Sequence, residues 1–195
     1  KFFKAKQIEQ NQRFQSFDST EFSLEPDLKE SPGCLRDFQT AFWILEHCFE
    51  IKKLQDCVTA KMFSKKEIDS INESYAHIKT LRFFINLESS ANRISFENQL
   101  LLAKKTKLKA SKKSSAVEKF MRTFFLHASN LSDFNELVFQ AYDDQLTLLK
   151  RPYTKNYYIF KDRLGIADSV DLTKKPELIL DSLIQVGKLK KINGL

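Results

Sequence analysis

The sequence predicts a mainly α-helical fold: an antiparallel helical bundle, followed near the C-terminus by a short β-hairpin and a terminal helix. Apolar residues recur every three or four positions through long segments, a spacing that places them on one face of a helix. Two Ser-x-x-Glu capping boxes mark helix starts. The connections between these segments are short or lysine-rich, which is typical of antiparallel helical neighbours.

The composition predicts a folded, water-soluble chain. Of its 195 residues, 42% are hydrophobic and 29% are charged, which is ordinary for a globular protein. No apolar run approaches the roughly 18 to 20 residues of a membrane span, and the start, KFFKAKQIEQ, lacks the apolar core of a signal peptide. We therefore expect a cytoplasmic protein without a membrane partner. The first residue is Lys rather than Met, which fits a chain that begins inside a longer reading frame.

The first two predicted helices differ in character. Residues 2–16 predict a polar, weakly packed helix, and an irregular stretch follows as far as Gly33. A second helix is expected from Leu35 to about Leu54, with Trp43 and Ile44 widening its apolar face. That face is formed by Leu35, Phe38, Phe42, Leu45 and Phe49.

Capping signals locate the next helices. Ser64 with Glu67 has capping-box spacing, and the apolar pattern then continues toward Leu87. A shorter helix, SFENQLLLAKK, begins at Ser95.

The second capping box, Ser115 with Glu118, opens the longest pattern of the chain. Its apolar positions continue to about Leu149, and we expect a break near Ser132. The phenylalanines of this and the other apolar stripes are interpreted as core residues.

The character of the chain changes after residue 150. The segment NYYIFKDRLGIADS alternates weakly and contains Gly165 after a charged turn, which predicts a short β-hairpin. Pro176 is suited to the first turn of a terminal helix, which should end near Gly187.

Residues with reactive side chains form no recognisable catalytic or metal motif. Cys34, Cys48 and Cys57 match neither a disulfide framework nor paired zinc knuckles, so we expect reduced thiols and no metal. With four glycines in the chain, neither a GxGxxG nor a GxxxxGK phosphate loop is present. The three histidines lie far apart in the sequence, each within a helical pattern, and we expect them at the boundary of the apolar faces. They are His47, His77 and His127.

Much of the net charge of +7 lies in AKKTKLKASKKSSA, residues 103–116. The six lysines of the loop 104–113 could bind phosphates. No aromatic residue or arginine is interleaved with them to stack on bases, so a solvated loop between two helices is the stronger interpretation. Nucleic acid is therefore not an expected partner, and the role of the loop stays open.

The segment LEPDLKESPGCLRDFQTAFWI resembles a stretch of the bacterial protein-PII uridylyltransferases that closes the nucleotidyltransferase domain and leads into a helical domain. The pattern of that family is LEPN, a lysine and GPGGLRD, followed by a helix that contains tryptophan. Similarity continues in order through LRFFINLESSANRISFENQ and AVEKFMRTFFLHA, and it covers roughly residues 7–187. The matching positions in the first segment are Leu24, Glu25, Pro26, Lys29, Pro32, Gly33, Leu35, Arg36, Asp37, Gln39 and Trp43.

The resemblance implies three regions: 1–34, the end of a nucleotidyltransferase domain with its joint loop; 35–150, a helical bundle; and 151–195, a hairpin and helix leading toward a missing downstream domain. In the family, the carboxylates that bind magnesium and UTP lie upstream of the first motif. We therefore expect this chain to hold no cofactor and not to transfer UMP by itself. The resemblance implies that the parent enzyme uses magnesium and UTP and acts in nitrogen regulation. It also implies two kinds of partner for this chain: the PII signal protein and the remaining domains of the parent enzyme.

Two alternatives stay open at this point. The glutamine-synthetase adenylyltransferases carry a related version of the first motif, so the target could be glutamine synthetase rather than PII. The chain could also be a free-standing basic helical module that uses its lysine-rich loop on nucleic acid or an acidic partner.

The first motif predicts a stiff, turned loop. Pro26 and Pro32 restrict their own φ angles, and Gly33 can adopt a conformation closed to other residues. Cys34 stands where the family has a second glycine, and its side chain narrows the backbone conformations allowed at that position.

The charged residues of this loop are the candidate site. Lys29 and Arg36 are suited to nucleotide phosphates or to a carboxylate of the transferase domain. They could instead form a salt-bridge clamp with Glu30 or Asp37 that holds the loop against the bundle. We favour the clamp, because the sequence does not distinguish a single phosphate contact from an ion pair. Asp37 also complements the positive end of the following helix. The candidate residues are Lys29, Glu30, Gly33, Arg36 and Asp37.

Overall fold

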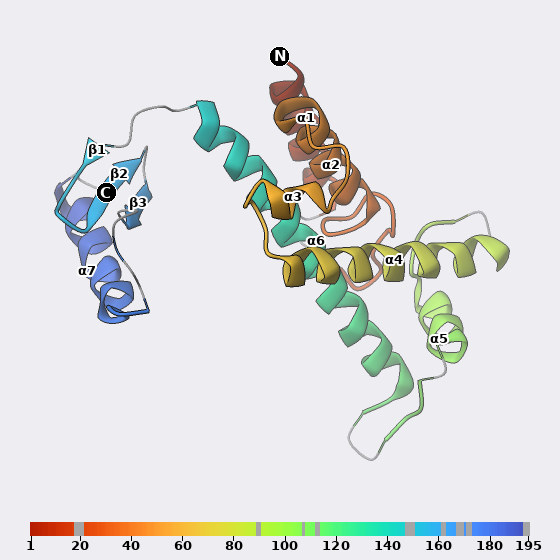
Figure 1. Ribbon diagram of the computed structural model, residues 1–195. Helices are drawn as coiled ribbons and strands as arrows, with labels where there is room; N and C mark the ends of the chain where they lie inside the picture. Colours follow the sequence, from red (N-terminus) through yellow and green to blue (C-terminus); the bar gives the residue numbers. More distant parts are fainter. Residues whose placement is uncertain are drawn as a thin grey trace. The chain divides into compact units, whose positions relative to one another are not determined.

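A computed structural model of the chain is mainly helical, with a small antiparallel sheet and a C-terminal helix, as the sequence predicts (Figure 1). It divides into two compact units, Lys1–Tyr142 and Asp143–Leu195. Within the described part of the chain, no helix combines the length and the apolar character that crossing a membrane requires. The described residues are 1–17, 22–88, 91–106, 108–111, 114–146, 151–160, 163–166, 170 and 173–192.

The first unit is built around its longest helix. Side chains of α1 (Phe2–Gln15) contact that helix, α6 (Ala116–Leu146), in reverse order: Phe3 lies against Phe139, and Gln10 bonds to Asn135. The two helices therefore run in opposite directions, as expected for antiparallel packing. The helices of this unit are α1 (Phe2–Gln15), α2 (Leu35–Phe49), α3 (Asp56–Thr59), α4 (Lys65–Glu88), α5 (Phe96–Lys105) and α6 (Ala116–Leu146).

The core lies where α2 and α4 pack on α6. Phe120, Phe124 and Phe134 of α6 are at most 1% exposed, which confirms that the phenylalanine stripes are core residues. The aliphatic residues of the same cluster include Ile44, Leu45, Ile68, Ile78, Leu81 and Ile85.

Capping explains where three helices begin. The Ser64 N–H donates to Glu67 Oε2 at 2.6 Å, and the Ser115 N–H donates to Glu118 Oε2 at the same distance. In each box the serine hydroxyl accepts the return bond from the glutamate N–H. The hydroxyl of Ser95 caps α5, which begins at Phe96, one residue after the predicted start.

Helix α1 is packed more firmly than its polar sequence predicts. The Phe3 side chain is 4% exposed and lies between Phe139 and Tyr142 of α6. The Arg13 side chain is also nearly buried. Two well-placed side chains thus anchor a polar helix that has no continuous apolar stripe and whose Ile8 is exposed.

Helix α2 ends earlier than predicted, at Phe49 rather than Leu54. Glu50 takes a left-handed conformation with φ 58°, and its N–H bonds back to the carbonyl of Leu45. Ile51 and Leu54 are still buried, so the apolar pattern continued although the helix did not.

Helix α6 runs without a break through Ser132, contrary to the prediction. Leu131 and Phe134 flank that position and are both buried, so the same apolar stripe packs against the core on either side of it. The predicted end near Leu149 falls in 147–150, outside the described residues.

The second unit contains the predicted hairpin. Strands β2 (Tyr157–Phe160) and β3 (Arg163–Ile166) pair antiparallel, with Tyr158 opposite Gly165. A short strand β1 (Arg151–Pro152) extends the sheet in the order β1-β2-β3. Helix α7 (Glu177–Ile192) begins directly after Pro176, as predicted, but continues past Gly187 instead of ending there.

Candidate functional site

The joint loop, residues 24–34, is held in place by backbone pairing with the segment that precedes α5. The Leu28 N–H donates to the Asn92 carbonyl at 2.9 Å, and the Ile94 N–H donates to the Pro26 carbonyl at 2.8 Å. Leu28 and Ile94 are fully buried. The loop therefore joins the core at Leu28, whereas Leu24 at its start is 73% exposed.

The turn inside the loop satisfies its own polar groups. Asp27 Oδ1 accepts from the N–H groups of Lys29 and Glu30, each at 2.8 Å. The Asp27 N–H in turn donates to the Ser31 hydroxyl at 2.8 Å. Because these bonds close within five residues, the turn is shaped locally before it meets the helices.

Gly33 is the point where the loop touches α6. Its φ is +72°, and a Cβ at this position would lie 2.2 Å from the carbonyl oxygen of Ala128. Both facts require glycine, as the sequence predicts. The backbone of Cys34, by contrast, is extended, with φ −103° and ψ −167°. A residue with a side chain can adopt this conformation, so the position where the family has a second glycine does not require one here.

Glu30 receives both predicted cations. The Lys29 ammonium and the Arg36 guanidinium each lie 3.0 Å from Glu30 Oε1. Partial burial raises the pKa of Glu30, but hydrogen bonds from Arg36 and Lys29 outweigh it and lower the pKa overall. The hydrogen bond to Glu30 likewise raises the pKa of Arg36. The three side chains form one half-buried ionic cluster.

Asp37 has different partners and is completely buried. Its Oδ2 accepts from the Gly33 N–H at 2.6 Å, and its Oδ1 pairs with the guanidinium of Arg13 from α1. The Asn135 side chain of α6 donates to the Asp37 carbonyl at 2.9 Å. Arg13 also donates to the Glu30 carbonyl at 2.7 Å. Asp37 thus connects α1, the joint loop, α2 and α6.

The structure separates residues that the sequence grouped together. Glu30 takes the two predicted cations, whereas Asp37 pairs with Arg13. Arg13 and Asn135 lie 24 and 98 positions from Asp37, so no local spacing pointed to either. In the sequence, Arg13 is one arginine in a helix that was expected to be weakly packed, and this was the only signal that pointed to it.

The carboxylates of the joint loop are paired within this chain, and the family resemblance places the magnesium-binding carboxylates upstream of this loop. The side-chain oxygens of Asp27, Glu30 and Asp37 bind backbone N–H groups or cationic side chains. The described residues also contain no group of three or more His, Cys, Asp or Glu side chains that could hold a metal ion. No catalytic step is assigned to this loop.

Two histidines that are distant in sequence meet between α4 and α6. The rings of His77 and His127 stack with their centroids 4.2 Å apart, and His127 Nδ1 lies 3.0 Å from the Ser74 hydroxyl. Burial, together with the neighbouring His127, lowers the pKa of His77 to about 4. Burial also lowers the pKa of His127. Both rings are therefore neutral packing elements at pH 7.

The cysteines behave as buried or half-buried thiols. Cys34, Cys48 and Cys57 are all free, in agreement with the predicted reduced state. Burial raises the pKa of the Cys34 and Cys57 thiols, which keeps them protonated at neutral pH.

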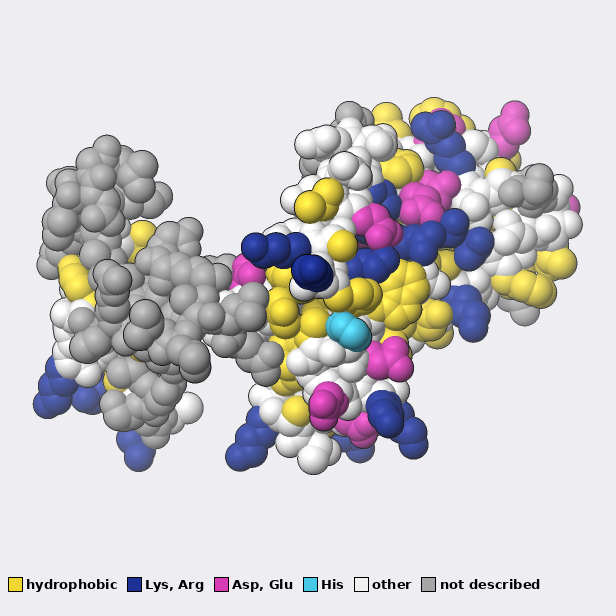
Figure 2. Space-filling model, turned by 90° about the horizontal axis from the view of Figure 1, so that it is seen from above, with side chains coloured by type: hydrophobic (Ala, Val, Ile, Leu, Met, Phe, Trp, Pro, Cys, Tyr) yellow, Lys and Arg dark blue, Asp and Glu magenta, His cyan; other side chains and the backbone are white. Residues whose placement is uncertain are grey.

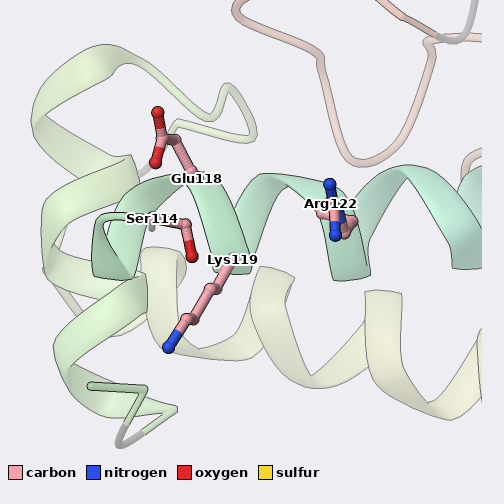
Figure 3. A pocket seen from close by; sticks show the side chains of 4 residues that line it. All are labelled: Ser114, Glu118, Lys119 and Arg122. Atoms are coloured by element: carbon pink, nitrogen blue, oxygen red, sulfur yellow. The ribbon is translucent and has the colours of Figure 1, made fainter. Parts of the chain in front are cut away.

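The junction of the lysine-rich loop with α6 encloses a surface cavity of about 310 Å³ (Figure 3). Lys119 Nζ donates to the Lys109 carbonyl at 2.8 Å, and Glu118 belongs to the capping box. Figure 3 shows these two side chains leaving α6 on opposite sides. Their bonds support the loop and the helix start. On the face drawn in Figure 2, basic and acidic side chains lie interspersed.

The sequence model of the GlnD PII-uridylyltransferase family matches residues 1–139. No solved structure matches the chain.

Three curated relatives carry the name bifunctional uridylyltransferase/uridylyl-removing enzyme. The relative from Haemophilus influenzae (strain PittEE) is 28% identical over 98% of this chain and 23% of its own length. The relative from Hydrogenovibrio crunogenus is 27% identical over 94% of this chain and 22% of its own length. The relative from Acinetobacter baylyi is 25% identical over the whole chain and 23% of its own length. The chain thus spans less than a quarter of these relatives.

Proposed function

Because this chain belongs to the GlnD PII-uridylyltransferase family, we propose that it is a segment of a bifunctional uridylyltransferase/uridylyl-removing enzyme and supplies the helical region that supports the transferase site. The parent enzyme would transfer UMP from UTP to the PII signal protein, in the cytoplasm, as part of nitrogen regulation. Magnesium and UTP would bind to domains of the parent outside these 195 residues.

The contacts of Asp37 are the observation that carries the structural part of this proposal. One buried carboxylate ties α1 and the joint loop to α2. In the proposed parent, α1 would end the transferase domain, and α2 would begin the helical domain. A rigid connection at this point would fix the position of the two domains relative to each other.

The ionic cluster at Glu30 supports the clamp interpretation over direct substrate contact. Lys29 and Arg36 both bind the same carboxylate, so a nucleotide phosphate would have to compete with an ion pair that already exists. We therefore assign Lys29, Glu30 and Arg36 to stiffening the loop, together with Gly33 and Asp37.

The proposal is tested by transplanting the segment. Residues 1–139, the range matched by the family model, replace the equivalent segment of the Haemophilus influenzae relative. The chimera is assayed for magnesium-dependent transfer of labelled UMP from UTP to PII, and we expect transfer. A chimera that melts cooperatively but labels no PII would count against the proposal.

The isolated chain provides the complementary test. We expect no labelling of PII by the 195 residues alone under the same conditions. Labelled PII would show that a complete transferase site lies within this chain.

A further inference from the structure

Helix α5 buries one side and turns the other to solvent. Figure 1 shows this helix near the end of α4, and its buried residues are Gln99, Leu102 and Ala103. The opposite side lines an open surface groove of about 420 Å³. We call this side the α5 face, and its members are Glu97, Leu100, Leu101 and Lys104.

The centre of the α5 face is apolar. Leu100 is 50% exposed, and Leu101 beside it is half-buried. Phe96, one turn before Leu100, is 64% exposed and enlarges the apolar area. A surface helix normally carries polar side chains on the side that faces water. A partner that covered these side chains would remove their apolar surface from water.

The two charges of the α5 face lie at its opposite ends. Glu97 is in the first turn of the helix and Lys104 is in the last turn. Among the described residues neither has an ion-pair partner, whereas the neighbouring Lys105 pairs with Glu88 of α4 at 3.4 Å. A complementary partner should therefore offer a cation near Glu97 and an anion near Lys104.

We propose that the α5 face binds the same face of a second copy of this chain, with the two helices antiparallel. A two-fold axis between Leu100 and Leu101 brings Glu97 of one copy to the level of Lys104 of the other, because the two positions are equally far from the axis. The same rotation repeats the ion pair at the other end. The leucines of both copies then form the centre of the contact.

Other arrangements satisfy the α5 face less well. A parallel pair of helices would place Glu97 against Glu97 and Lys104 against Lys104, and like charges oppose association. On an anionic lipid surface, Glu97 would approach the headgroups together with the leucines. The α5 face is acidic at its start and basic at its end, and its own antiparallel copy matches this polarity.

Sedimentation equilibrium of the 195-residue chain tests the association. The contact is smaller than a standard interface, so we expect a dimer with a dissociation constant on the order of 100 µM. Leu100→Ser should weaken it at least about tenfold. Leu137→Ser is the matched control, because Leu137 of α6 is 47% exposed and lies beside Glu67, at the other end of α4. It should leave the dissociation constant unchanged.

Charge reversal tests the antiparallel pairing. Glu97→Lys gives the face of each copy two positive ends, and Lys104→Glu gives it two negative ends. Either variant alone should associate at least about tenfold more weakly than the parent chain. An equimolar mixture of the two variants again pairs opposite charges at both ends, and its affinity should return to within about threefold of the parent value. The control Lys66→Glu, at an exposed position in the first turn of α4, should change nothing.

The mixture also separates association from folding. Each reversal places an unfavourable charge at an end of α5, and circular dichroism and melting curves measure the effect on the fold. A folding defect would persist in the mixture, whereas a lost ion pair would be restored.

Three outcomes would overturn the proposal. The first is a chain that remains monomeric up to about 1 mM, which would mean that something other than a second copy covers the α5 face. The second is a dimer that Leu100→Ser and both charge reversals leave unchanged. The third is a mixture of the reversed variants that associates no more tightly than either variant alone.

Discussion

Arg13 and Asp37 form a buried ion pair between α1 and the first turn of α2. Asp37 is fully buried and the Arg13 side chain is 10% exposed, so each charge depends on the other for compensation. The pair is also connected to the joint loop, because Asp37 accepts from the Gly33 N–H and Arg13 donates to the Glu30 carbonyl. One contact therefore fixes the position of three segments.

Replacing Arg13 should destabilise the first unit strongly. Arg13→Met keeps most of the apolar stem but leaves the Asp37 carboxylate buried without its cation, and we expect a loss of about 3 kcal/mol in the free energy of unfolding. Urea denaturation measures this change. Asp133→Asn, at an exposed carboxylate of α6, is the control and should stay within about 0.5 kcal/mol of the parent chain. Equal stability of the two variants would show that the pair does not tie the segments together.

Gly33 should tolerate no side chain. Gly33→Ala combines a positive φ with a clash against the Ala128 carbonyl, so we expect a loss of about 3 kcal/mol or more. Gly187→Ala, inside α7, should instead be neutral or stabilise by up to about 1 kcal/mol, because alanine favours a helix interior. Thermal melting of each variant distinguishes the two cases, and an unchanged melting temperature for Gly33→Ala would contradict the contact with α6.

Removing the Glu30 carboxylate should have a smaller effect that disappears in acid. Glu30→Gln breaks two half-exposed ion pairs, and we expect a cost of about 0.5 to 1 kcal/mol at pH 7. The folded-state pKa of Glu30 is lowered, so its stabilisation is present above the unfolded pKa and is lost as pH falls through the folded pKa. Unfolding curves of both proteins at pH 7 and pH 3 test this, since a constant difference would exclude a charged role for Glu30.

The His77–His127 stack should make stability rise with pH under mildly acidic conditions. The pKa of His77 is about 4 in the folded chain and near 6.5 when unfolded, so the unfolded state binds the proton first as pH falls. Stability should drop between about pH 6.5 and pH 4, by about 1 to 2 kcal/mol once solvent screening of the half-buried rings is included.

His77→Phe keeps an aromatic ring in the stack and removes the proton site, so it should flatten this dependence. The comparison variant is His47→Phe, at an exposed position of α2, which leaves the stack intact. Free energies of unfolding at pH 4, 5, 6 and 7 decide the question. A His77→Phe slope equal to that of the parent chain would rule out the stack as the cause.

The sequence by itself determined the features whose free energy is local. The capping boxes at Ser64 and Ser115 and the hairpin around Gly165 were predictable, because each depends on residues within a few positions of one another. The special backbone conformation at Gly33 was predictable in the same way, but its contact with Ala128 of α6 was not. The end of α2 was predicted wrongly because the apolar pattern continues through Leu54. The apolar residues after the helix are in a loop but are buried in the core, as helical residues would be.

Only the tertiary structure decided which distant residues meet. Asp37 could have paired with Lys29 or Arg36 on sequence grounds, but packing of α1 brought Arg13 to it from 24 positions away. His77 and His127 came together for the same reason, across the contact of α4 with α6. The physical cause is that a buried charge or ring takes whichever partner the packed helices place within reach, and sequence spacing does not encode that distance.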